Sequence, residues 1–286
     1  IFWCSAALVA ITGTIVALVQ GTISRSLVIA VNEQPAIEST LKRAGLTALV
    51  IVETSVILAG ISAVSLLLAH AHITSYQALG AAIALIIPAC VAAYASMGPA
   101  REALSAIARQ PFLSNKIITT LLISLTVIQT PVILGFITGL IIAVRAPFTM
   151  AHGLSYIAGG IAVGLGSVGP LLGLGKFGAS LCRAIGRNPS AHGPLVPFLF
   201  VGQALIETPS LLALIIALAL IVLPPTSDTL FEGILRLIAG ITTALVTFGP
   251  GIASGKTAGA AAREIGKAPE KSRLIMQLSL ITQTII

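Results

Sequence analysis

Charged residues are scarce in this sequence. Only 9% of its 286 residues are Asp, Glu, Lys or Arg, whereas 56% are hydrophobic and the mean hydropathy is +1.05. Soluble domains carry about 25% charged residues, so the composition excludes an ordinary soluble domain and indicates a membrane protein. Long uncharged runs occur at 1–24, 117–144 and 237–255. A membrane-spanning helix needs about 20 apolar residues, so we expect an all-α transmembrane fold with about eight membrane helices.

Cysteine is also rare, and the basic excess is confined to part of the chain. Cys4, Cys90 and Cys182 are scattered and fit neither a disulfide framework nor a metal site. We therefore expect no bound metal or cofactor. The net charge of +7 does not indicate nucleic acid, because 14 of the 16 Lys and Arg residues fall on one side of the topology inferred below. The chain begins and ends inside apolar runs, which we interpret as a fragment.

The chain contains an internal repeat. Four polar turns end in a proline, at Pro35, Pro111, Pro189 and Pro269, spaced 76, 78 and 80 residues apart. Each turn joins a run rich in Gly and Ala to a second, bulkier apolar run, so the predicted unit is a helical hairpin that crosses the membrane twice. The predicted hairpins cover 1–72, 73–150, 151–226 and 227–286.

One polar position recurs in the second helix of each hairpin. Eighteen residues beyond the first three prolines lie Glu53, Gln129 and Glu207. Each is followed by a threonine: Thr54, Thr130 and Thr208. A carboxylate in the middle of a membrane costs several kcal/mol, roughly, so such residues are rare and usually functional. The fourth counterpart would be residue 287, one position beyond the last residue.

The first helix of each hairpin carries small residues along its whole length. Hairpin three has glycines at 159, 160, 164, 166, 169, 173, 175 and 178, and hairpin four has them at 249, 251, 255 and 259. Small residues let helix backbones approach closely in lipid. A single GxxxG pair would suffice for simple dimerisation, so the longer stripes favour a tightly packed inner circle of helices.

The basic residues predict the orientation of the hairpins. Fourteen lie around the proline turns, and only Arg145 and Arg236 lie on the opposite side. Cytoplasmic loops carry the excess of Lys and Arg. We therefore expect the hairpin turns to be cytoplasmic and the linkers to lie outside.

These motifs together resemble a known family. A Gly-rich helix, a turn such as Arg109-Gln110-Pro111 or Arg187-Asn188-Pro189, and a second helix with Glu207-Thr208-Pro209 are similar to the c subunit (proteolipid) of rotary ATP synthases. The resemblance covers all four hairpins. It implies a rotor ring built with other copies of the chain, which turns in membrane lipid against a stator a-type subunit and is seated on central-stalk subunits.

The resemblance also implies roles for individual residues. Glu53 and Glu207 match the ion-carrying carboxylates, and the turns at Arg109 and Arg187 match the loops that contact the central stalk. Glu33 and Lys267 replace that arginine in hairpins one and four, which puts stalk contact there in doubt. ATP chemistry in this family takes place on other subunits.

The carried ion is H⁺ or Na⁺. Family members that carry sodium have a Gln fifteen residues before the turn proline and a hydroxyl residue after the Glu. Hairpin one matches with Gln20, Glu53 and Thr54, whereas hairpin three keeps Thr208 but has Leu174 at the Gln position. Gln203, one helical turn before Glu207, could assist either ion. The mixed pattern slightly favours protons.

Two departures from the pattern affect the mechanism. Gln129 cannot release a proton, so hairpin two should carry no ion, and fewer carriers per turn favour an ATP-driven pump. Lys176 lies inside the first helix of hairpin three, where it either extends toward the membrane surface or approaches Glu207. The alternative functions are a multipass proton-coupled transporter, in which inverted repeats would be typical, and a structural membrane scaffold.

Overall fold

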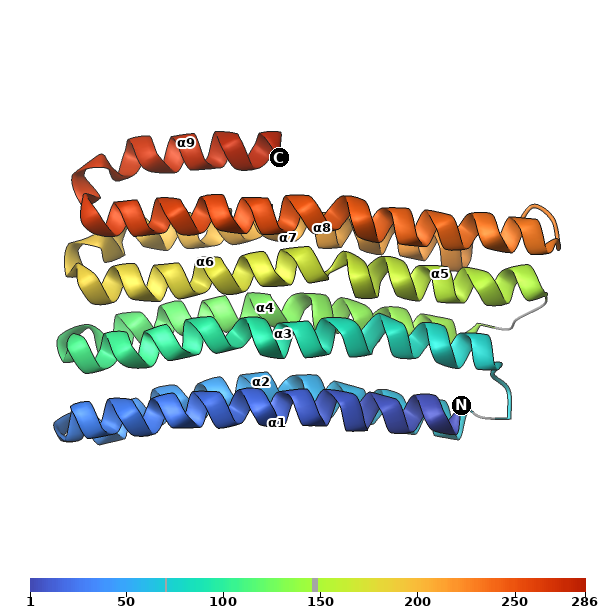
Figure 1. Ribbon diagram of the computed structural model, residues 1–286, viewed down its shortest axis with the longest axis horizontal. Helices are drawn as coiled ribbons and strands as arrows, with labels where there is room; N and C mark the ends of the chain where they lie inside the picture. The colour runs from blue at the N-terminus through green and yellow to red at the C-terminus, as the bar shows by residue number, and fades with distance from the viewer. Residues whose placement is uncertain (70, 146–148) are drawn as a thin grey trace.

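The computed structural model describes residues 1–69, 71–145 and 149–286, and within them helices are joined by short turns and linkers (Figure 1). Seven helical spans among these residues are long and apolar enough to cross a membrane. The predicted all-α transmembrane fold is thus confirmed. The α-helices are α1 (Phe2–Glu33), α2 (Glu38–Leu68), α3 (Ser75–Arg109), α4 (Ser114–Val144), α5 (Met150–Gly166), α6 (Val168–Arg187), α7 (His192–Val222), α8 (Leu230–Lys267) and α9 (Ser272–Ile285).

The described residues form nine α-helices rather than the expected eight, because the first helix of hairpin three is interrupted. Helices α5 and α6 follow each other in line and are separated only at Ser167. Pro170 has no N–H to donate to the carbonyl of Gly166, and a proline inside a helix removes that bond. At the same point the Ser167 hydroxyl donates to the Gly164 carbonyl at 2.9 Å. The second helix of hairpin four, α9, has 14 residues.

The four turns share one local cause. The residue before each turn proline adopts φ between −132° and −140° and ψ between 70° and 104°, outside the helical region. Proline disfavours the helical conformation of the residue that precedes it. Each first helix therefore ends there, and the proline begins a short 3₁₀ turn that leads into the second helix.

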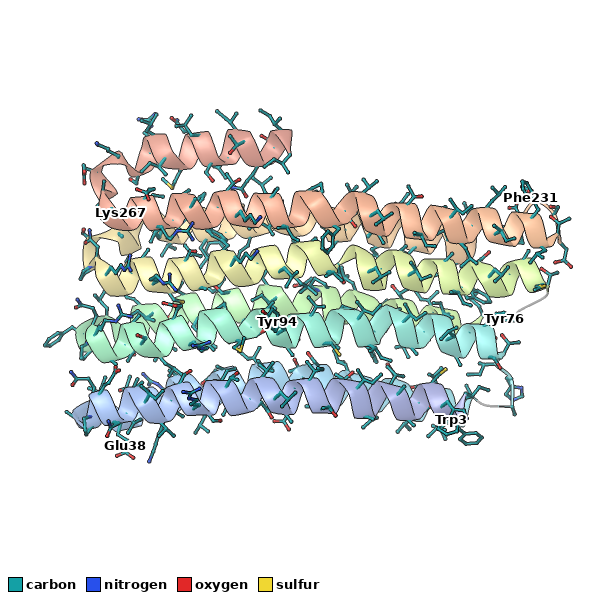
Figure 2. The ribbon with its side chains drawn as sticks, in the orientation of Figure 1. Trp3, Glu38, Tyr76, Tyr94, Phe231 and Lys267 are labelled. Atoms are coloured by element: carbon teal, nitrogen blue, oxygen red, sulfur yellow. The ribbon has the colours of Figure 1, made fainter. Side chains whose placement is uncertain are left out.

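The opposite ends of three first helices are capped by threonine. Thr74, Thr149 and Thr229 accept a hydrogen bond from the backbone N–H three residues later, at the starts of α3, α5 and α8. Such caps satisfy N–H groups that lack a partner inside the helix. Figure 2 shows aromatic residues at this linker end and charged Glu38 and Lys267 at the turn end.

The hairpins lie side by side as two rows of helices. The first helices (α1, α3, α5 with α6, and α8) form one row, and the second helices (α2, α4, α7 and α9) form the other. All four turns lie at one end (Figure 1). The hairpins therefore repeat in parallel rather than as inverted repeats.

Glycine allows the first-helix row to pack more closely than the second. A Cβ on Gly160 would lie 2.2 Å from the Gly80 carbonyl oxygen, and one on Gly175 would lie 2.6 Å from that of Ala95. Between α6 and α8, a Cβ on Gly173 would lie 2.3 Å from the Gly251 carbonyl oxygen. Backbones this close leave no room for side chains. Because the hairpins pack more closely at their first helices than at their second helices, a parallel row of them forms a curved array.

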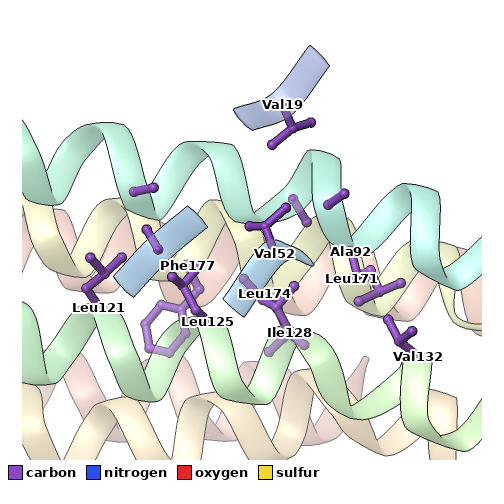
Figure 3. Close-up of a cluster of buried hydrophobic side chains, with 14 of the residues drawn as sticks. Val19, Val52, Ala92, Leu121, Leu125, Ile128, Val132, Leu171, Leu174 and Phe177 are labelled. Atoms are coloured by element: carbon purple, nitrogen blue, oxygen red, sulfur yellow. The ribbon is translucent and has the colours of Figure 1, made fainter. Parts of the chain in front are cut away.

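Bulkier side chains fill the space between the two rows. Figure 3 shows Leu174 and Phe177 of α6 packed against aliphatic residues of α4. The rings of Phe177 and Phe198 meet edge to face, with their centroids 5.2 Å apart. This apolar filling holds each second helix at a fixed height beside its first helix, which positions the carboxylate-bearing segments.

Candidate ion-carrying site

The three recurring polar residues lie in the middle of the second helices. Glu53 is in α2, Gln129 in α4 and Glu207 in α7. Each is eighteen residues past its turn proline, which places it about 27 Å from the turn if the segment is helical. Their environments nevertheless differ.

Glu207 is half-buried between two second helices. The Thr130 side chain of α4 lies near its carboxyl group. The Oε1 atom is buried and has no hydrogen-bond partner among the described residues. The amide of Gln203, one helical turn earlier, is likewise buried without a partner in this part of the chain. Polar groups buried in this way cost free energy unless a proton, ion or water satisfies them.

Gln129 occupies the same position in α4, where its amide oxygen is bonded but its Nε2 is buried without a partner among the described residues. It is 6% exposed, and its Oε1 accepts a hydrogen bond from the Ser55 hydroxyl of α2 at 3.0 Å. An amide cannot titrate, so this bond persists at any physiological pH. Through this bond Gln129 contacts the second helix of the preceding hairpin.

Glu53 is exposed on the outer surface of α2. Gln20 of α1 donates from its Nε2 to the Leu49 carbonyl at 3.4 Å, one helical turn from Glu53. The Thr54 hydroxyl donates to the Ile51 carbonyl of its own helix at 2.6 Å. Similarly, Thr208 donates to the Ala204 carbonyl at 2.9 Å. Both threonine hydroxyl protons are thus bonded within their own helices.

Comparison with known proteins identifies the family to which this arrangement belongs. The family model for the C subunit of ATP synthase matches residues 79–142 and 157–220. An ATP synthase c subunit of Cereibacter sphaeroides, the one numbered 2, is 46% identical over 71 residues, which cover 25% of this chain and 86% of that protein. The chain belongs to the family of ATP synthase c subunits.

Two further relatives agree with this assignment. The ATP synthase c subunit of Chloroflexus aurantiacus is 39% identical over 66 residues, or 23% of this chain and 87% of that protein. The protein of the same name from Dehalococcoides mccartyi is 38% identical over 68 residues, or 24% of this chain and 90% of that protein. Each relative therefore corresponds to about one hairpin of this chain, which is an integral membrane protein of the rotor ring.

The turns present polar and aromatic groups at one end of this rotor protein. Arg109 is exposed, and its guanidinium bonds the Ser105 carbonyl at 3.2 Å and the Ser105 hydroxyl at 2.6 Å. In the next turn Arg187 is exposed, while Asn188 accepts a bond from the Ser190 N–H at 3.1 Å. Gln110, Pro111 and Pro189 complete these two turns.

Phe112 is a candidate contact residue that the sequence motifs did not single out. It follows Pro111 directly and is fully exposed at the turn end. A large, exposed aromatic residue at a polar turn is typical of a surface that binds another protein. The position of Phe112 directly after the turn proline was the feature of the sequence that could have identified it.

Lys176 does not approach the carboxylate of its hairpin. The described residues form four ion pairs, and none joins Lys176 to Glu207. Lys176 instead lines a cavity with Lys256, between α6 and α8. The structure thus gives no support to the interpretation in which Lys176 holds Glu207 ionised, and extension toward the membrane surface stays a prediction.

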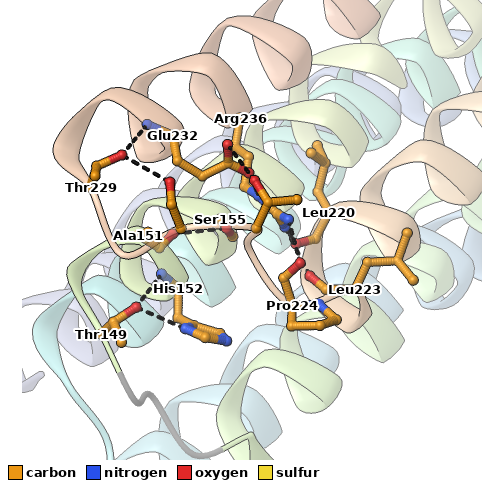
Figure 4. A network of polar contacts seen from close by, with 12 residues as sticks. Thr149, Ala151, His152, Ser155, Leu220, Leu223, Pro224, Thr229, Glu232 and Arg236 are labelled. Atoms are coloured by element: carbon orange, nitrogen blue, oxygen red, sulfur yellow. Dashed lines mark hydrogen bonds and ion pairs between the residues drawn. The ribbon is translucent and has the colours of Figure 1, made fainter.

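The linker end contains a separate polar network around Arg236 (Figure 4). Its guanidinium donates to the carbonyls of Leu220, Leu223 and Pro224 at 3.1, 2.9 and 2.8 Å. It also pairs with Glu232 at 3.2 Å. Arg236 thus satisfies carbonyls at the end of α7, where helical partners run out. Its role is to join α7 to α8.

Proposed function

We propose that this rotor protein carries protons across the membrane on Glu53 and Glu207 as the ring turns. The observation that carries the proposal is the half-buried Glu207, whose Oε1 has no partner among the described residues. The family membership supports a role in the rotor ring, and the carboxyl group of Glu207 offers a site where a proton can be added and removed.

The physical basis is the cost of charge in lipid. A carboxylate facing hydrocarbon must be neutral, because ionised side chains are expensive there. A carboxyl that reaches a polar channel in a stator a-type subunit is able to ionise, and a stator cation would then attract it and prevent slippage. Each ion that crosses 100 mV gains about 2.3 kcal/mol, which biases rotation in one direction.

The neighbours of the two carboxylates favour protons over sodium. Sodium is a hard cation and requires several oxygen ligands. Leu174 stands where hairpin three would need a glutamine oxygen, and it is buried and apolar. In hairpin one, Gln20 turns its amide N–H toward the backbone of α2 rather than toward the exposed Glu53. A hydroxyl such as that of Thr130 suffices to hold a neutral carboxyl group by hydrogen bonding.

Other contacts of the ring are part of the same proposal. The exposed turns at Arg109 and Arg187, together with Phe112, would seat central-stalk subunits. The excess of Lys and Arg at the turn end supports a cytoplasmic location for those turns by the positive-inside rule. Other copies of the chain would complete the ring.

Gln129 favours the operation of the ring as an ATP-driven pump. Its bond to Ser55 fills the carrier position of hairpin two without a titratable group. Fewer protons per turn require a larger driving force to make ATP. Equal rates of synthesis and hydrolysis at a modest membrane potential would contradict this direction.

The decisive experiment is labelling with a hydrophobic carbodiimide, which attacks neutral, lipid-accessible carboxyl groups. Mass spectrometry of the membrane-embedded chain across pH, with and without sodium, would locate the adducts. We expect labelling at Glu53 and Glu207 that falls at high pH and is insensitive to sodium. Glu102, which is paired with Arg183 at the turn end, is the internal control and should remain unlabelled.

Two outcomes would change the conclusion. Protection by sodium would make the chain a sodium carrier and would give Gln20 and Thr54 roles as ligands. The absence of labelling at both glutamates would refute ion carriage by this chain and leave it as a structural member of the ring.

A further inference from the structure

A cluster of four cations lies on the first-helix row, away from the carboxylates. Lys176 and Arg183 of α6, with Lys256 and Arg263 of α8, line one cavity of about 240 Å³. Ala179, Ser180, Gly255 and Gly259 complete its lining, so no carboxylate of the described residues contributes to it. Glycine and serine keep the two helices close, which brings cations of both helices around one space.

Two of these cations bond polar side chains, and among the described residues only Arg183 of the four has a counter-charge. Arg183 forms a two-pronged ion pair with Glu102 of α3, with its Nε 2.9 Å from Oε2. Arg263 donates to the Ser180 hydroxyl at 3.2 Å. Within the described parts of the chain, Lys176 and Lys256 form no ion pair. They lie thirteen residues before their turn prolines, or about 20 Å along the helix, at a depth where an unpaired charge is costly.

A cavity two hairpins earlier, about one helical turn nearer the prolines, is balanced in charge, whereas the basic cavity is a feature of hairpins three and four. Between α1 and α3, a cavity of about 230 Å³ is lined by Arg101 and Arg109 but also by Glu33 and Glu102. In hairpins one and two the repeat places no cation at the positions of the four basic residues. Those positions hold Thr22, Ile29, Gly98 and Ser105.

A second cavity adjoins the basic one and is mostly apolar. It measures about 200 Å³, lies between α3 and α6, and is lined by Tyr94, Met97 and Leu172, with Lys176 as the only charged residue among its described lining. Lys176 and Ala179 line both cavities. The surface thus offers a cationic recess beside an apolar one, as an amphiphile with an anionic head and apolar chains requires.

We propose that this recess binds the phosphate headgroup of an anionic phospholipid on the first-helix face of the ring. Lys176, Lys256 and Arg263 contact the phosphate, and the acyl chains lie over Tyr94 and Leu172. The basic cavity is smaller than the roughly 300–1,000 Å³ typical of pockets that enclose a whole ligand. It therefore suits a headgroup rather than a nucleotide. The lipid supplies the counter-charge that the two lysines lack.

Lipid retention by the full-length chain tests this proposal. The chain is reconstituted into phosphatidylcholine vesicles that contain phosphatidylglycerol and then extracted into mild detergent. The phosphatidylglycerol that remains bound is counted by native mass spectrometry. A Lys or Arg near anionic lipid contributes about 1 kcal/mol. Combined Lys176→Met and Lys256→Met substitutions should therefore weaken retention about 30-fold, whereas Lys→Arg at both positions should preserve it.

The matched control removes two cations from the balanced cavity at the same end of the chain. Combined Arg101→Met and Arg109→Met substitutions should leave lipid retention unchanged. Equal retention by the wild type and the Lys→Met variant would overturn the proposal, as would displacement of the lipid by inorganic phosphate alone. If the double variant does not insert, Lys256→Met alone should reduce retention about 5-fold. Ion carriage by Glu53 and Glu207 is measured separately, so either proposal can fail without the other.

Discussion

Gly255→Ala should drive two closely packed helices of the bundle apart. A Cβ at this position would lie 2.1 Å from the Cα of Gly173 in α6. Carbon atoms pack favourably at about 3.5–4.0 Å, so α6 and α8 would have to separate by at least about 1.4 Å here. The obstacle is backbone, which cannot rotate out of the way as a side chain can.

The expected cost follows from two opposing effects. Alanine favours the helix by about 1 kcal/mol relative to glycine, whereas overpacking of a close contact typically costs about 1–3 kcal/mol. The separation needed here is large, so the net effect should be a loss of about 1–2 kcal/mol. It should appear as a lower midpoint of thermal unfolding in detergent, followed by helical circular dichroism.

Gly13→Ala in the interior of α1, where the next residue is Thr14 and not a proline, is the matched control. A Cβ there would meet nothing within 4 Å among the described residues, so only the gain in helix propensity remains and the midpoint should stay equal or rise. If both substitutions shift the midpoint equally, close approach of α6 and α8 does not stabilise the bundle, and the account of the first-helix row is wrong.

Two other substitutions test the site and the linker end. Gln129→Glu should create a third carboxyl that reacts with hydrophobic carbodiimide, because Gln129 occupies the position held by Glu53 and Glu207 in their hairpins. Absence of a third adduct would show that the Ser55 contact excludes the reagent or holds the new group ionised. Arg236→Met should destabilise the chain by about 2 kcal/mol, because three carbonyls at the end of α7 lose a charged donor. Thermal unfolding measures this loss. As a control, Arg273→Met, at an exposed position, should leave the midpoint unchanged.

The turns and the repeat could be predicted because their causes are local. A proline restricts the residue before it whatever the surroundings, so four proline turns at nearly equal spacing indicate four hairpins. The polar residue eighteen positions beyond each of the first three prolines is likewise visible in the sequence. The break between α5 and α6 was less evident, since the Gly-Pro pair at Pro170 interrupts its rod and that at Pro250 does not.

The sequence by itself determined that this chain is a helical membrane protein with parallel hairpins and carboxylates at mid-helix. Hydropathy, proline and helical periodicity act within one segment and are therefore readable from it. Only the tertiary structure decided that Ser55 bonds Gln129, that Glu207 keeps a buried oxygen without a partner among the residues described, and that Lys176 lies beside Lys256 rather than Glu207. These relations depend on the rotation and height of one helix against its neighbour, which packing across the whole bundle sets.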